Sequence, residues 1–400
     1  MNKIDFKKEP KCAIVTDAFT RKSVCVIRSI GKSGFKVAAL GDSIFTTGFW
    51  SKYCNMHSIC KNASANKDEF GKALLKLLNN PKLIKPVIFP MEDDSLIWCC
   101  ENIDLLTDKS YILLPPFHSL MIAENKSETI KFAHELGIPC PKTMFPCSSE
   151  EFIDSIRSME NNDFVVKPVN SSGSLGLVYG NTLSIDEWKN YWDKYGQAIV
   201  QERLDNRGSG LGISILMDNN CDCIAHFAHQ RVHQYPISGG PGTNRISIVY
   251  PELLELSIKL LKRLSWTGIA MVEWKIDVDT NIPKLMEINP RFWGSVELAV
   301  RSGVDFPALY AKLARGEKIE PVKNYKVGVK CRWLIPGDIL RYINERKEKK
   351  KTESLVQFLK GLPREAEEWD RSDLIGTLAC LVCQAILVLN PKYWKYLKRK

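Results

Sequence analysis

The amino-acid sequence predicts a mixed α/β plus α+β protein with about two or three folding units. In residues 1–120, apolar strand segments alternate with helical segments, which is typical of a parallel sheet covered by helices. In residues 121–318, strand–loop–strand segments and a hairpin dominate. Residues 319–400 form a basic, partly apolar tail. With 44% hydrophobic and 26% charged residues, a chain of 400 residues can bury a sizeable core.

The first unit, residues 1–120, is expected to be a small α/β domain. Its strand segments are KCAIVTDAF (11–19), FKVAALGD (35–42), KPVIFP (85–90) and YILLPP (111–116). Its helical segments are KSVCVIRSIGKSG (22–34) and FGKALLKLLNN (70–80). The Gly-Lys-Ser in the first helix is not a Walker A phosphate loop, because Val26 stands where that motif needs a glycine.

The second unit, residues 121–318, begins with a helix and continues with strands. The helical segments are KSETIKFAHE (126–135), PELLELSIKLLKRLSW (251–266) and GSVELAVRSGVDFPALYAKLARG (294–316). The strand-containing segments are DFVVKPVNSSGSLGLVYG (163–180), QAIVQERL (197–204) and GLGISILMDNNCDCIAHFAHQRVHQYP (210–236). Two further strands, GIAMVEWKID (268–277) and PKLMEINPRF (283–292), are joined by the turn VDTNI and predict a hairpin.

The hairpin places polar side chains on one face. If its strands pair, Glu273 and Glu287 face one another and Asn289 follows on the same side. Two carboxylates and an amide oxygen are hard ligands that suit Mg²⁺ together with phosphate oxygens. Arg291, two residues further on, would reach an anion held there. Taken alone, these residues favour a solvent-exposed sheet face over a metal site, and the other segments raise the case for the metal.

Other segments have the side chains that a phosphate site needs. Lys167 leaves a strand directly before a Gly/Ser loop whose backbone N–H groups could bind phosphates, and the loop residues of interest are Ser172, Gly173 and Gly176. Lys126 at a helix start is a second phosphate cation. The linker Glu202-Arg203-Leu204 could meet a nucleotide base or ribose. Arg231, His233, Tyr235, Trp293 and the turn Gly239–Gly242 could line a substrate mouth.

The order of these residues resembles the ATP-grasp superfamily. The resemblance covers about residues 10–320 and rests on Lys126, Lys167 with its Gly-rich loop, Glu202, Glu273 and Glu287-x-Asn289-x-Arg291. The segments HQRVHQYPISGGPG, AMVEWKID and LMEINPRFWGSVELAVRSGVDFP resemble a branch of ATP-dependent carboligases, whose members occur among polysaccharide and cell-envelope functions. The set as a whole is specific, whereas no single segment is.

The resemblance implies a fold of three parts. Residues 1–120 would be a Rossmann-like pre-ATP-grasp domain and residues 121–318 the two-lobed ATP-grasp domain. The small lobe would cover about 126–200 and the large lobe about 201–318. Residues 319–400 would be a C-terminal extension with an apolar helix at 374–389.

The resemblance also implies the site residues and the cofactors, which are ATP and Mg²⁺, with Mn²⁺ as an alternative ion. The metal would be held by Glu273, Glu287 and Asn289. Catalytic roles would fall to Arg291, Arg231 and Lys167. The nucleotide would contact Lys126, Lys167, Ser172, Gly173, Gly176, Glu202, Arg203 and Leu204. The linker lacks the acidic residue that often binds ribose in relatives, and Asp205 is the candidate to replace it.

The leading functional hypothesis is an ADP-forming carboxylate–amine ligase. ATP would phosphorylate a small-molecule, glycan or peptide carboxylate, and an amine would attack the resulting acyl phosphate. A phosphotransferase for a non-carboxylate acceptor and a nucleotide-binding regulator are the alternatives. The complete set of Glu273, Glu287, Asn289 and Arg291 speaks against the regulator. A biotin-dependent carboxylase is disfavoured, because this sequence does not contain the biotin-carrier motif MKM.

Charge and cysteine content indicate the cellular setting. The net charge is +10, and residues 321–400 supply 18 Lys+Arg against 9 Asp+Glu, without any nucleic-acid-binding motif. The 13 cysteines and the absence of a signal-like N-terminus predict a cytoplasmic protein with reduced thiols. Cys221 and Cys223 are expected to be ordinary strand residues. His226, His229 and His233 are expected to line the nucleotide pocket, not to bind a metal.

The tail contains the apolar segment LIGTLACLVCQAILVL (374–389), followed by NPKYWKYLKRK. Two interpretations stay open. The segment is either a membrane-inserted anchor with its basic end among anionic headgroups on the inner face of the membrane, or a helix packed on the body or on a second subunit. An oligomer is compatible with the second interpretation.

Overall fold

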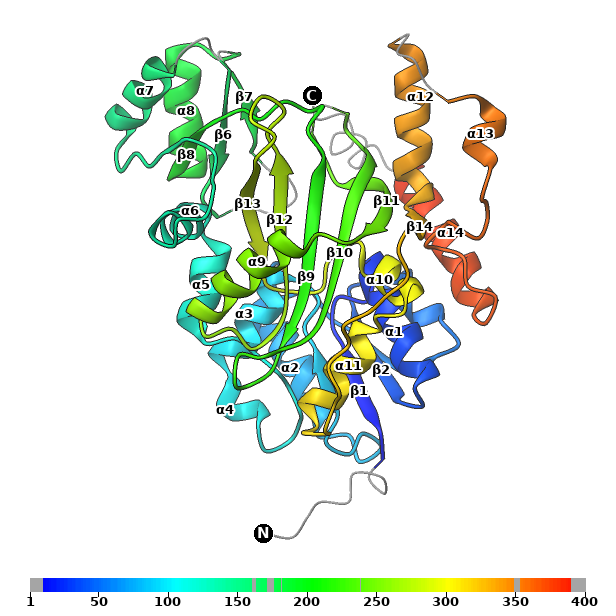
Figure 1. Ribbon diagram of the computed structural model, residues 1–400. Helices are drawn as coiled ribbons and strands as arrows, with labels where there is room; N and C mark the ends of the chain where they lie inside the picture. The colour runs from blue at the N-terminus through cyan, green and yellow to red at the C-terminus, as the bar shows by residue number, and fades with distance from the viewer. Residues whose placement is uncertain are drawn as a thin grey trace.

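The protein is described by a computed structural model that covers residues 10–159, 163–170, 176–180, 182–237, 239–348 and 353–389. The described residues form three β-sheets. In Figure 1 the largest sheet stands in the centre, the small sheet lies at the upper left and the N-terminal unit lies below. This arrangement confirms the predicted combination of an α/β unit with α+β units.

The N-terminal sheet is parallel throughout, in the order β3-β2-β1-β4. Its strands are β1 (Cys12–Val15), β2 (Lys36–Gly41), β3 (Cys54–Ile59) and β4 (Val87–Phe89). Its helices are α1 (Arg21–Lys32), η1 (Thr47–Trp50), α2 (Lys67–Leu78), α3 (Asp93–Glu101), α4 (Ile103–Leu106) and α5 (Phe117–Glu124). The Rossmann-like prediction is thereby confirmed. The segment YILLPP forms only one bridge, between Tyr111 and Val87, because its two prolines have no N–H for a ladder.

The small sheet is antiparallel, in the order β5-β8-β6-β7. Its strands are β5 (Thr143–Met144), β6 (Phe164–Pro168), β7 (Val178–Tyr179) and β8 (Ala198–Glu202). The accompanying helices are α6 (Lys126–Glu135), α7 (Ser149–Ser158) and α8 (Ile185–Tyr195). Apolar side chains of α7 and α8 pack on β6 and β8, with Phe152, Phe164 and Trp188 at the centre of this core. The small sheet therefore has a core of its own.

The large sheet has the order β13-β12-β9-β10-β11-β14, with antiparallel pairs throughout. Its strands are β9 (Gly210–Met217), β10 (Cys223–Gln234), β11 (Gly242–Ile248), β12 (Gly268–Ile276), β13 (Pro283–Asn289) and β14 (Lys330–Arg332). The helices α9 (Pro251–Arg263), α10 (Val296–Ser302) and α11 (Phe306–Ala314) belong to the same part of the chain. The predicted β12–β13 hairpin is present, with Glu273 opposite Glu287.

The large sheet and the N-terminal unit share one apolar core. Phe89 of β4 packs against Tyr310 of α11, with ring centroids 5.0 Å apart, and also against Phe292. The Tyr310 hydroxyl accepts a hydrogen bond from the Leu113 amide at 3.1 Å. Burial of these aromatic rings fixes the N-terminal unit against the large sheet, so that the carboxyl ends of β1 and β4 face the segment after β13.

The segment after residue 318 packs against both the large sheet and the N-terminal unit. It contains β14, the π-helical turn η3 (Leu334–Asp338) and the helices α12 (Ile339–Lys347), α13 (Leu355–Leu359) and α14 (Leu374–Leu389). Asp338 is fully buried and accepts hydrogen bonds from Thr243, Arg332 and Arg341. We call these four residues the Asp338 cluster. It attaches the C-terminal segment to β11 of the large sheet.

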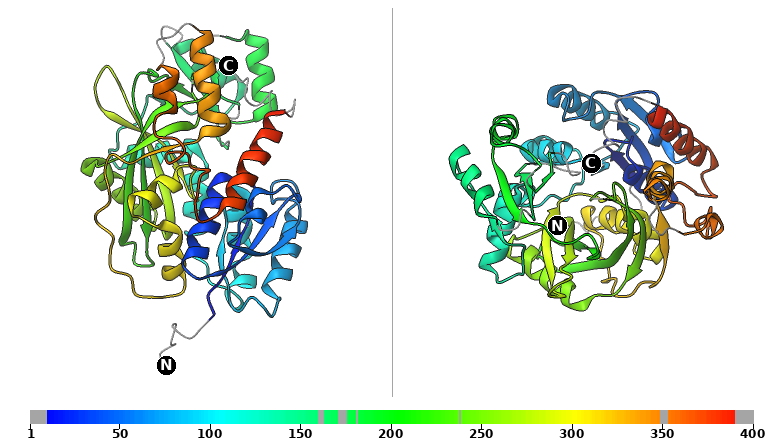
Figure 2. Two further views of the ribbon diagram at one scale, coloured as in Figure 1. Left: turned by 90° about the vertical axis from the view of Figure 1, so that its right-hand side faces the viewer. Right: turned by 90° about the horizontal axis from the view of Figure 1, so that it is seen from above.

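Helix α14 packs against η1 and α1 of the N-terminal unit. Figure 2 shows it beside that unit. Arg28 of α1 donates to the Thr377 hydroxyl of α14, which is 349 residues later in the chain. Cys380 and Cys383 are buried on its inner side. Of the two interpretations of this segment, packing on the body is the one that the structure shows. Among the described helices, none has the length and apolar content needed to cross a membrane.

Candidate active site

The β12–β13 hairpin brings the three predicted metal ligands together. Glu273 and Glu287 are cross-strand partners, and the Asn289 amide lies 3.3 Å from Glu273 Oε1 and 3.4 Å from Glu287 Oε1. Burial raises the pKa of Glu273, the Arg231 charge counteracts this shift, and the neighbouring Glu287 carboxylate adds to it. A cation placed between the two carboxylates would relieve their repulsion.

The donor set fits a hard divalent cation. Two carboxylates and one amide are the protein ligands with which Mg²⁺ typically combines phosphate oxygens and water. Within the described ranges, no group of three or more His, Cys, Asp or Glu side chains is placed to hold a metal. An ion at the hairpin would therefore depend on Asn289 and on a phosphate-bearing ligand in addition to Glu273 and Glu287.

Arg231 of β10 reaches across β9 to the hairpin and pairs with the Glu273 carboxylate. Glycines make this reach sterically feasible. A Cβ at Gly210 would lie 3.0 Å from Arg231 Cδ, and one at Gly242 would lie 3.1 Å from Arg231 Cγ. The glycines beside Arg231 are the signal in the sequence that a long side chain crosses the sheet here. Arg231 thus lies beside the predicted metal ligands and not only at the predicted substrate mouth.

Lys167 lies at the end of β6, where its ammonium group donates to Gln201 Oε1 at 2.7 Å. Burial lowers its pKa to about 8, and the nearby Glu287 carboxylate limits this effect. The Lys126 charge also lowers the pKa of Lys167, and the Glu273 carboxylate raises it. These residues are therefore within electrostatic range of one another, as the predicted phosphate and metal roles require.

Part of the predicted phosphate loop can be placed. Gly176 has φ +73° and its carbonyl accepts from the Tyr191 hydroxyl at 2.7 Å. The positive φ explains the glycine, because other residues rarely adopt it. Ser172 and Gly173 lie outside the described residues. Lys126 begins α6, and its backbone N–H donates to Val169 O at 3.1 Å, which ties the helix start to the strand that precedes the loop.

The linker between the small and large sheets is held by two lysines that the sequence reasoning missed. Lys284 donates to Glu202 Oε1 at 2.5 Å and to Asp277 Oδ2 at 3.0 Å. Lys275, its cross-strand partner, donates to Leu204 O at 2.9 Å. The hairpin that holds the predicted metal ligands therefore also positions the predicted nucleotide linker.

The remaining linker residues are also placed. Arg203 lies over the Tyr179 ring, 4.8 Å from its centroid. Asp205 accepts from Arg207 Nε at 2.9 Å, and this hydrogen bond lowers the pKa of Asp205 to about 2. Asp205 is thus already paired with Arg207, and a contact between Asp205 and a ribose would require this pair to separate. Glu202 is the acidic residue of the linker that the lysines orient.

Arg291 lies at the junction with the N-terminal unit. Its Nε is 2.5 Å from Asp93 Oδ1 and 3.6 Å from Glu92 Oε2. Glu92 also pairs with Lys22 at 3.1 Å. Burial raises the pKa of Glu124 to about 8, with Asp93 adding to the shift. The sequence reasoning missed these four N-terminal residues, since they lie about 170 to 270 positions before Arg291 in the chain.

The three histidines of β10 do not converge. His226 makes an edge contact with Tyr325. His229 is buried beside Ser295, with 3.3 Å between Nε2 and Oγ, and burial lowers its pKa to about 3. His233 Nδ1 is 3.8 Å from Asp338 Oδ1. The three side chains thus have separate surroundings, and their expected place along the nucleotide pocket stays a prediction. Cys221 and Cys223, at the β9–β10 turn, are free thiols.

Comparisons of sequence place the chain near known nucleotide-dependent enzymes. Residues 221–335 match a family described as "ATP-grasp in the biosynthetic pathway with Ter operon". The carbamoyl phosphate synthase large chain of Clostridium acetobutylicum is 21% identical over 51% of this chain and 20% of its own. The arginine-specific large chain of Halalkalibacterium halodurans is 23% identical over 53% and 21%, respectively. The chain thus matches about a fifth of the length of these relatives.

Comparisons of structure cover more of the chain. N5-carboxyaminoimidazole synthetase of Staphylococcus aureus, solved with ADP, has a TM-score of 0.65 and 16% identity, covering 87% of this chain and 89% of its own. Biotin carboxylase of Campylobacter jejuni has a TM-score of 0.63 and 13% identity over 80% and 74%. The predicted resemblance to the ATP-grasp superfamily is confirmed, and the chain has the same fold as these enzymes.

Proposed function

We propose that the protein is an ADP-forming ligase that uses ATP and Mg²⁺ to join a carboxylate to an amine. The arrangement of Glu273, Glu287 and Asn289 is the observation that supports this most strongly. These residues present two carboxylates and an amide on one hairpin, with the Arg231 and Lys167 cations beside them. A sheet face made only for solvent would not need half-buried, like-charged carboxylates at cross-strand positions.

The first chemical step would transfer the γ-phosphoryl group. A substrate carboxylate oxygen forms a bond to the γ-phosphorus, the bond to the bridging oxygen breaks, and ADP leaves. When bound, Mg²⁺ would neutralise phosphate charge, and Glu273, Glu287 and Asn289 are the residues that would hold it. Lys167 would bind phosphate oxygens with its ammonium group, and Arg231 would offset negative charge next to Glu273.

The second step would form the amide. The amine nitrogen attacks the acyl carbon, inorganic phosphate leaves, and the amine gives up a proton. We assign Arg291 to the acyl phosphate, because it follows the hairpin directly and its partners Glu92 and Asp93 hold it at the junction of two units. The linker residues Glu202, Arg203 and Leu204 are assigned to the nucleoside.

The substrates are proposed by class. The acid is a small-molecule, glycan or peptide carboxylate, and polysaccharide or cell-envelope biosynthesis is the setting that we propose for it. The matched family is described as belonging to a biosynthetic pathway. The cationic mouth residue Arg231 suits an anionic acid.

The test is ADP release by the full chain with Mg·ATP and pairwise panels of amines with amino-acid, uronic and peptide carboxylates. Glu287→Gln is the comparison variant, and amide products are identified by mass. Stimulation that requires one acid and one amine, and that disappears in Glu287→Gln, is the expected result. ADP formation with a phosphorylated acceptor and no amide would replace the ligase by a phosphotransferase. Nucleotide binding without ADP release under any pair would support a regulator.

A further inference from the structure

Helix α14 is oriented with its large aliphatic residues facing outward. Five of them are between 48% and 63% exposed, namely Leu374, Ile375, Leu378, Val382 and Ile386. The spacing of these residues along the helix puts them on one face. The polar or small side chains Asp373, Thr377, Cys380 and Gln384 face the body of the protein and are buried. This is the reverse of the pattern of an ordinary surface helix.

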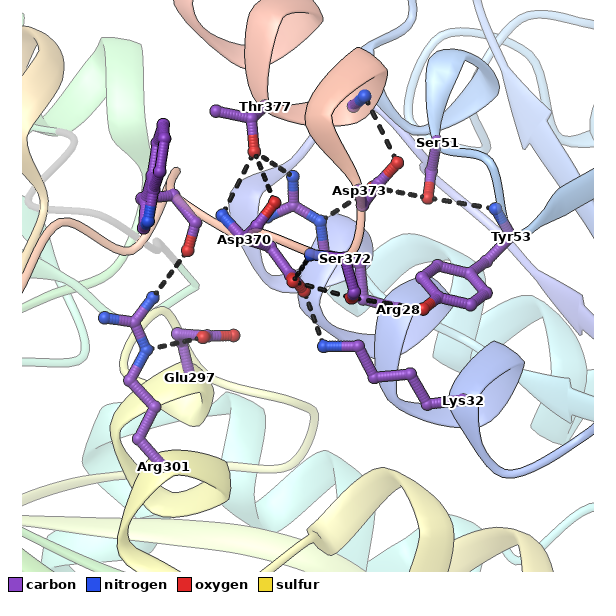
Figure 3. A network of polar contacts seen from close by, with 12 residues as sticks. Arg28, Lys32, Ser51, Tyr53, Glu297, Arg301, Asp370, Ser372, Asp373 and Thr377 are labelled. Atoms are coloured by element: carbon purple, nitrogen blue, oxygen red, sulfur yellow. Dashed lines mark hydrogen bonds and ion pairs between the residues drawn. The ribbon is translucent and has the colours of Figure 1, made fainter. Parts of the chain in front are cut away.

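Buried polar contacts fix this orientation (Figure 3). Arg28 Nε donates to Asp373 Oδ2 at 2.9 Å, and the Ser51 hydroxyl donates to the same oxygen at 2.8 Å. The Lys52 backbone N–H donates to Asp373 Oδ1 at 2.9 Å. Arg28 Nη2 lies 3.3 Å from the Thr377 hydroxyl. Turning the helix to hide its aliphatic face would leave a buried arginine and aspartate unpaired, which is strongly unfavourable.

The exposed face continues onto the N-terminal unit. Cys383 Sγ contacts Phe45 O at 3.2 Å, which places the loop before η1 beside α14. Phe45 is 64% exposed and Ile44 is 59% exposed. The Trp50 indole N–H donates to Ile44 O at 3.1 Å, so Trp50 belongs to the same loop surface. We call the five α14 residues together with Ile44, Phe45 and Trp50 the apolar face. Contiguous exposed side chains of this size indicate a binding surface.

The charges next to the apolar face identify its partner. Arg371 and Lys52, at the start of α14, are exposed. In sequence, residues 391–400 contain five basic residues, three aromatic residues and no acidic one. A second copy of the chain would bring the same basic residues, Arg371 and Lys52, to the interface, whereas anionic lipid headgroups would be attracted to them. Exposed tryptophan and phenylalanine beside aliphatic residues also suit the boundary between headgroups and acyl chains.

We propose that the apolar face binds the surface of an anionic lipid bilayer, with α14 lying along the membrane plane. The inner side of α14 is occupied by Arg28 and its neighbours, so only the outer face is available to lipid. The proposal concerns attachment and is independent of the ligase chemistry.

The test is sedimentation of the full-length protein with vesicles of phosphatidylcholine alone and of equal parts phosphatidylcholine and phosphatidylglycerol. The variant is Leu378→Gln with Val382→Gln, two exposed positions whose change leaves the buried contacts intact. The matched control is Val249→Gln with Ile282→Gln, which are 61% and 47% exposed on the large sheet. We expect binding to the mixed vesicles that weakens with added salt, and at least about a tenfold lower partition coefficient for the α14 variant only.

Three results would overturn the proposal. The first is no binding of the wild-type protein to mixed vesicles. The second is equal binding by the α14 variant, whose fold is checked by its melting temperature. The third is a wild-type dimer in gel filtration that the α14 variant converts to a monomer while vesicles bind neither form. That last result would assign the apolar face to a second copy.

Discussion

Two groups of carboxylates in this molecule, one fully buried at Asp338 and one half-buried on the β12–β13 hairpin, differ in how fully their charges are neutralised. In the Asp338 cluster, one carboxylate accepts from a hydroxyl and two arginines. Burial alone would raise the pKa of Asp338, but the nearby His233 and the charges of Arg341 and Arg332 keep the pKa well below its usual range. On the β12–β13 hairpin, Arg231 pairs with Glu273 alone, and the Asn289 amide donates to both Glu273 and Glu287. Burial raises the pKa of Glu273. A saturated carboxylate supports the fold, whereas an excess of carboxylate over cation leaves a site for a ligand.

The largest expected effect comes from removing the negative charge of the Asp338 cluster. Asp338→Asn leaves Arg332 buried without its counter-ion and removes one of the three carboxylates that pair with Arg341. We expect a loss of about 3–5 kcal/mol in the free energy of unfolding. Since the pKa of Asp338 is depressed, the loss should be complete above about pH 4 and shrink as the pH falls below the ordinary carboxyl value. Urea unfolding measures it.

The control for this variant is Asp154→Asn, which removes the exposed pair with Arg157. It should cost less than about 1 kcal/mol. Equal destabilisation by the two substitutions would show that the Asp338 cluster is not the stabilising group that its burial indicates.

The opposite response is expected on the hairpin. Glu287→Gln should lower ADP release about a thousandfold, or ~4 kcal/mol, by removing a ligand for the metal that offsets phosphate charge. The melting temperature without nucleotide should stay the same or rise, because Glu273 loses a like-charged neighbour. Turnover and thermal unfolding are measured on the same preparation. A variant that loses stability and activity together would place Glu287 among the structural carboxylates.

A smaller effect is expected where the hairpin meets the linker. Lys284→Met removes the ammonium group that orients Glu202, and we expect about tenfold weaker ATP binding, or ~1.4 kcal/mol. Calorimetry measures the dissociation constant. Lys262→Met is the matched control, because Lys262 pairs with Asp222 at the surface, 3.3 Å apart. If both variants bind ATP like the wild type, Lys284 has no part in the nucleotide site.

The smallest effect concerns the protonation of Lys167. Burial lowers its pKa to about 8, and a bound phosphate would raise it again, so ATP binding should take up part of a proton between about pH 8 and 10. ATP affinity should fall gradually over the same range, as the free site loses its charge. Calorimetry in two buffers of different ionisation enthalpy counts the protons. Lys167→Arg stays charged and should remove this uptake, whereas Lys275, whose pKa burial also lowers to about 8, remains in both proteins.

The hairpin was predicted correctly from the sequence because local signals specify it. The turn VDTNI and the alternation of apolar and polar residues define β12 and β13, and their register puts Glu273 opposite Glu287. Strand β3 has no such signal. Its residues CNMHSI alternate between half-buried and exposed positions at a sheet edge, so they form no apolar run. The short strand β14 depends on pairing with β11, and no turn motif next to it in the sequence indicates a strand.

Partners that lie far apart in the chain explain the rest. Arg291 was found from its spacing, but its contact with Asp93 spans 198 residues. Lys284 was visible on the hairpin, but its partner Glu202 is 82 residues earlier. Such pairs are decided by how the sheets pack together, and no local pattern records that.

The contact between Arg28 and Asp373 has a consequence for synthesis of the protein. The two residues are 345 positions apart, and a ribosome adding roughly 5–20 residues per second needs about 20–70 s to cover that interval. During this time the nascent N-terminal unit presents a guanidinium group and a neighbouring apolar surface that have not yet been covered by α14. Helix α14 can therefore dock only after the N-terminal unit has been synthesised. The packing of that unit is completed by a segment that is made much later.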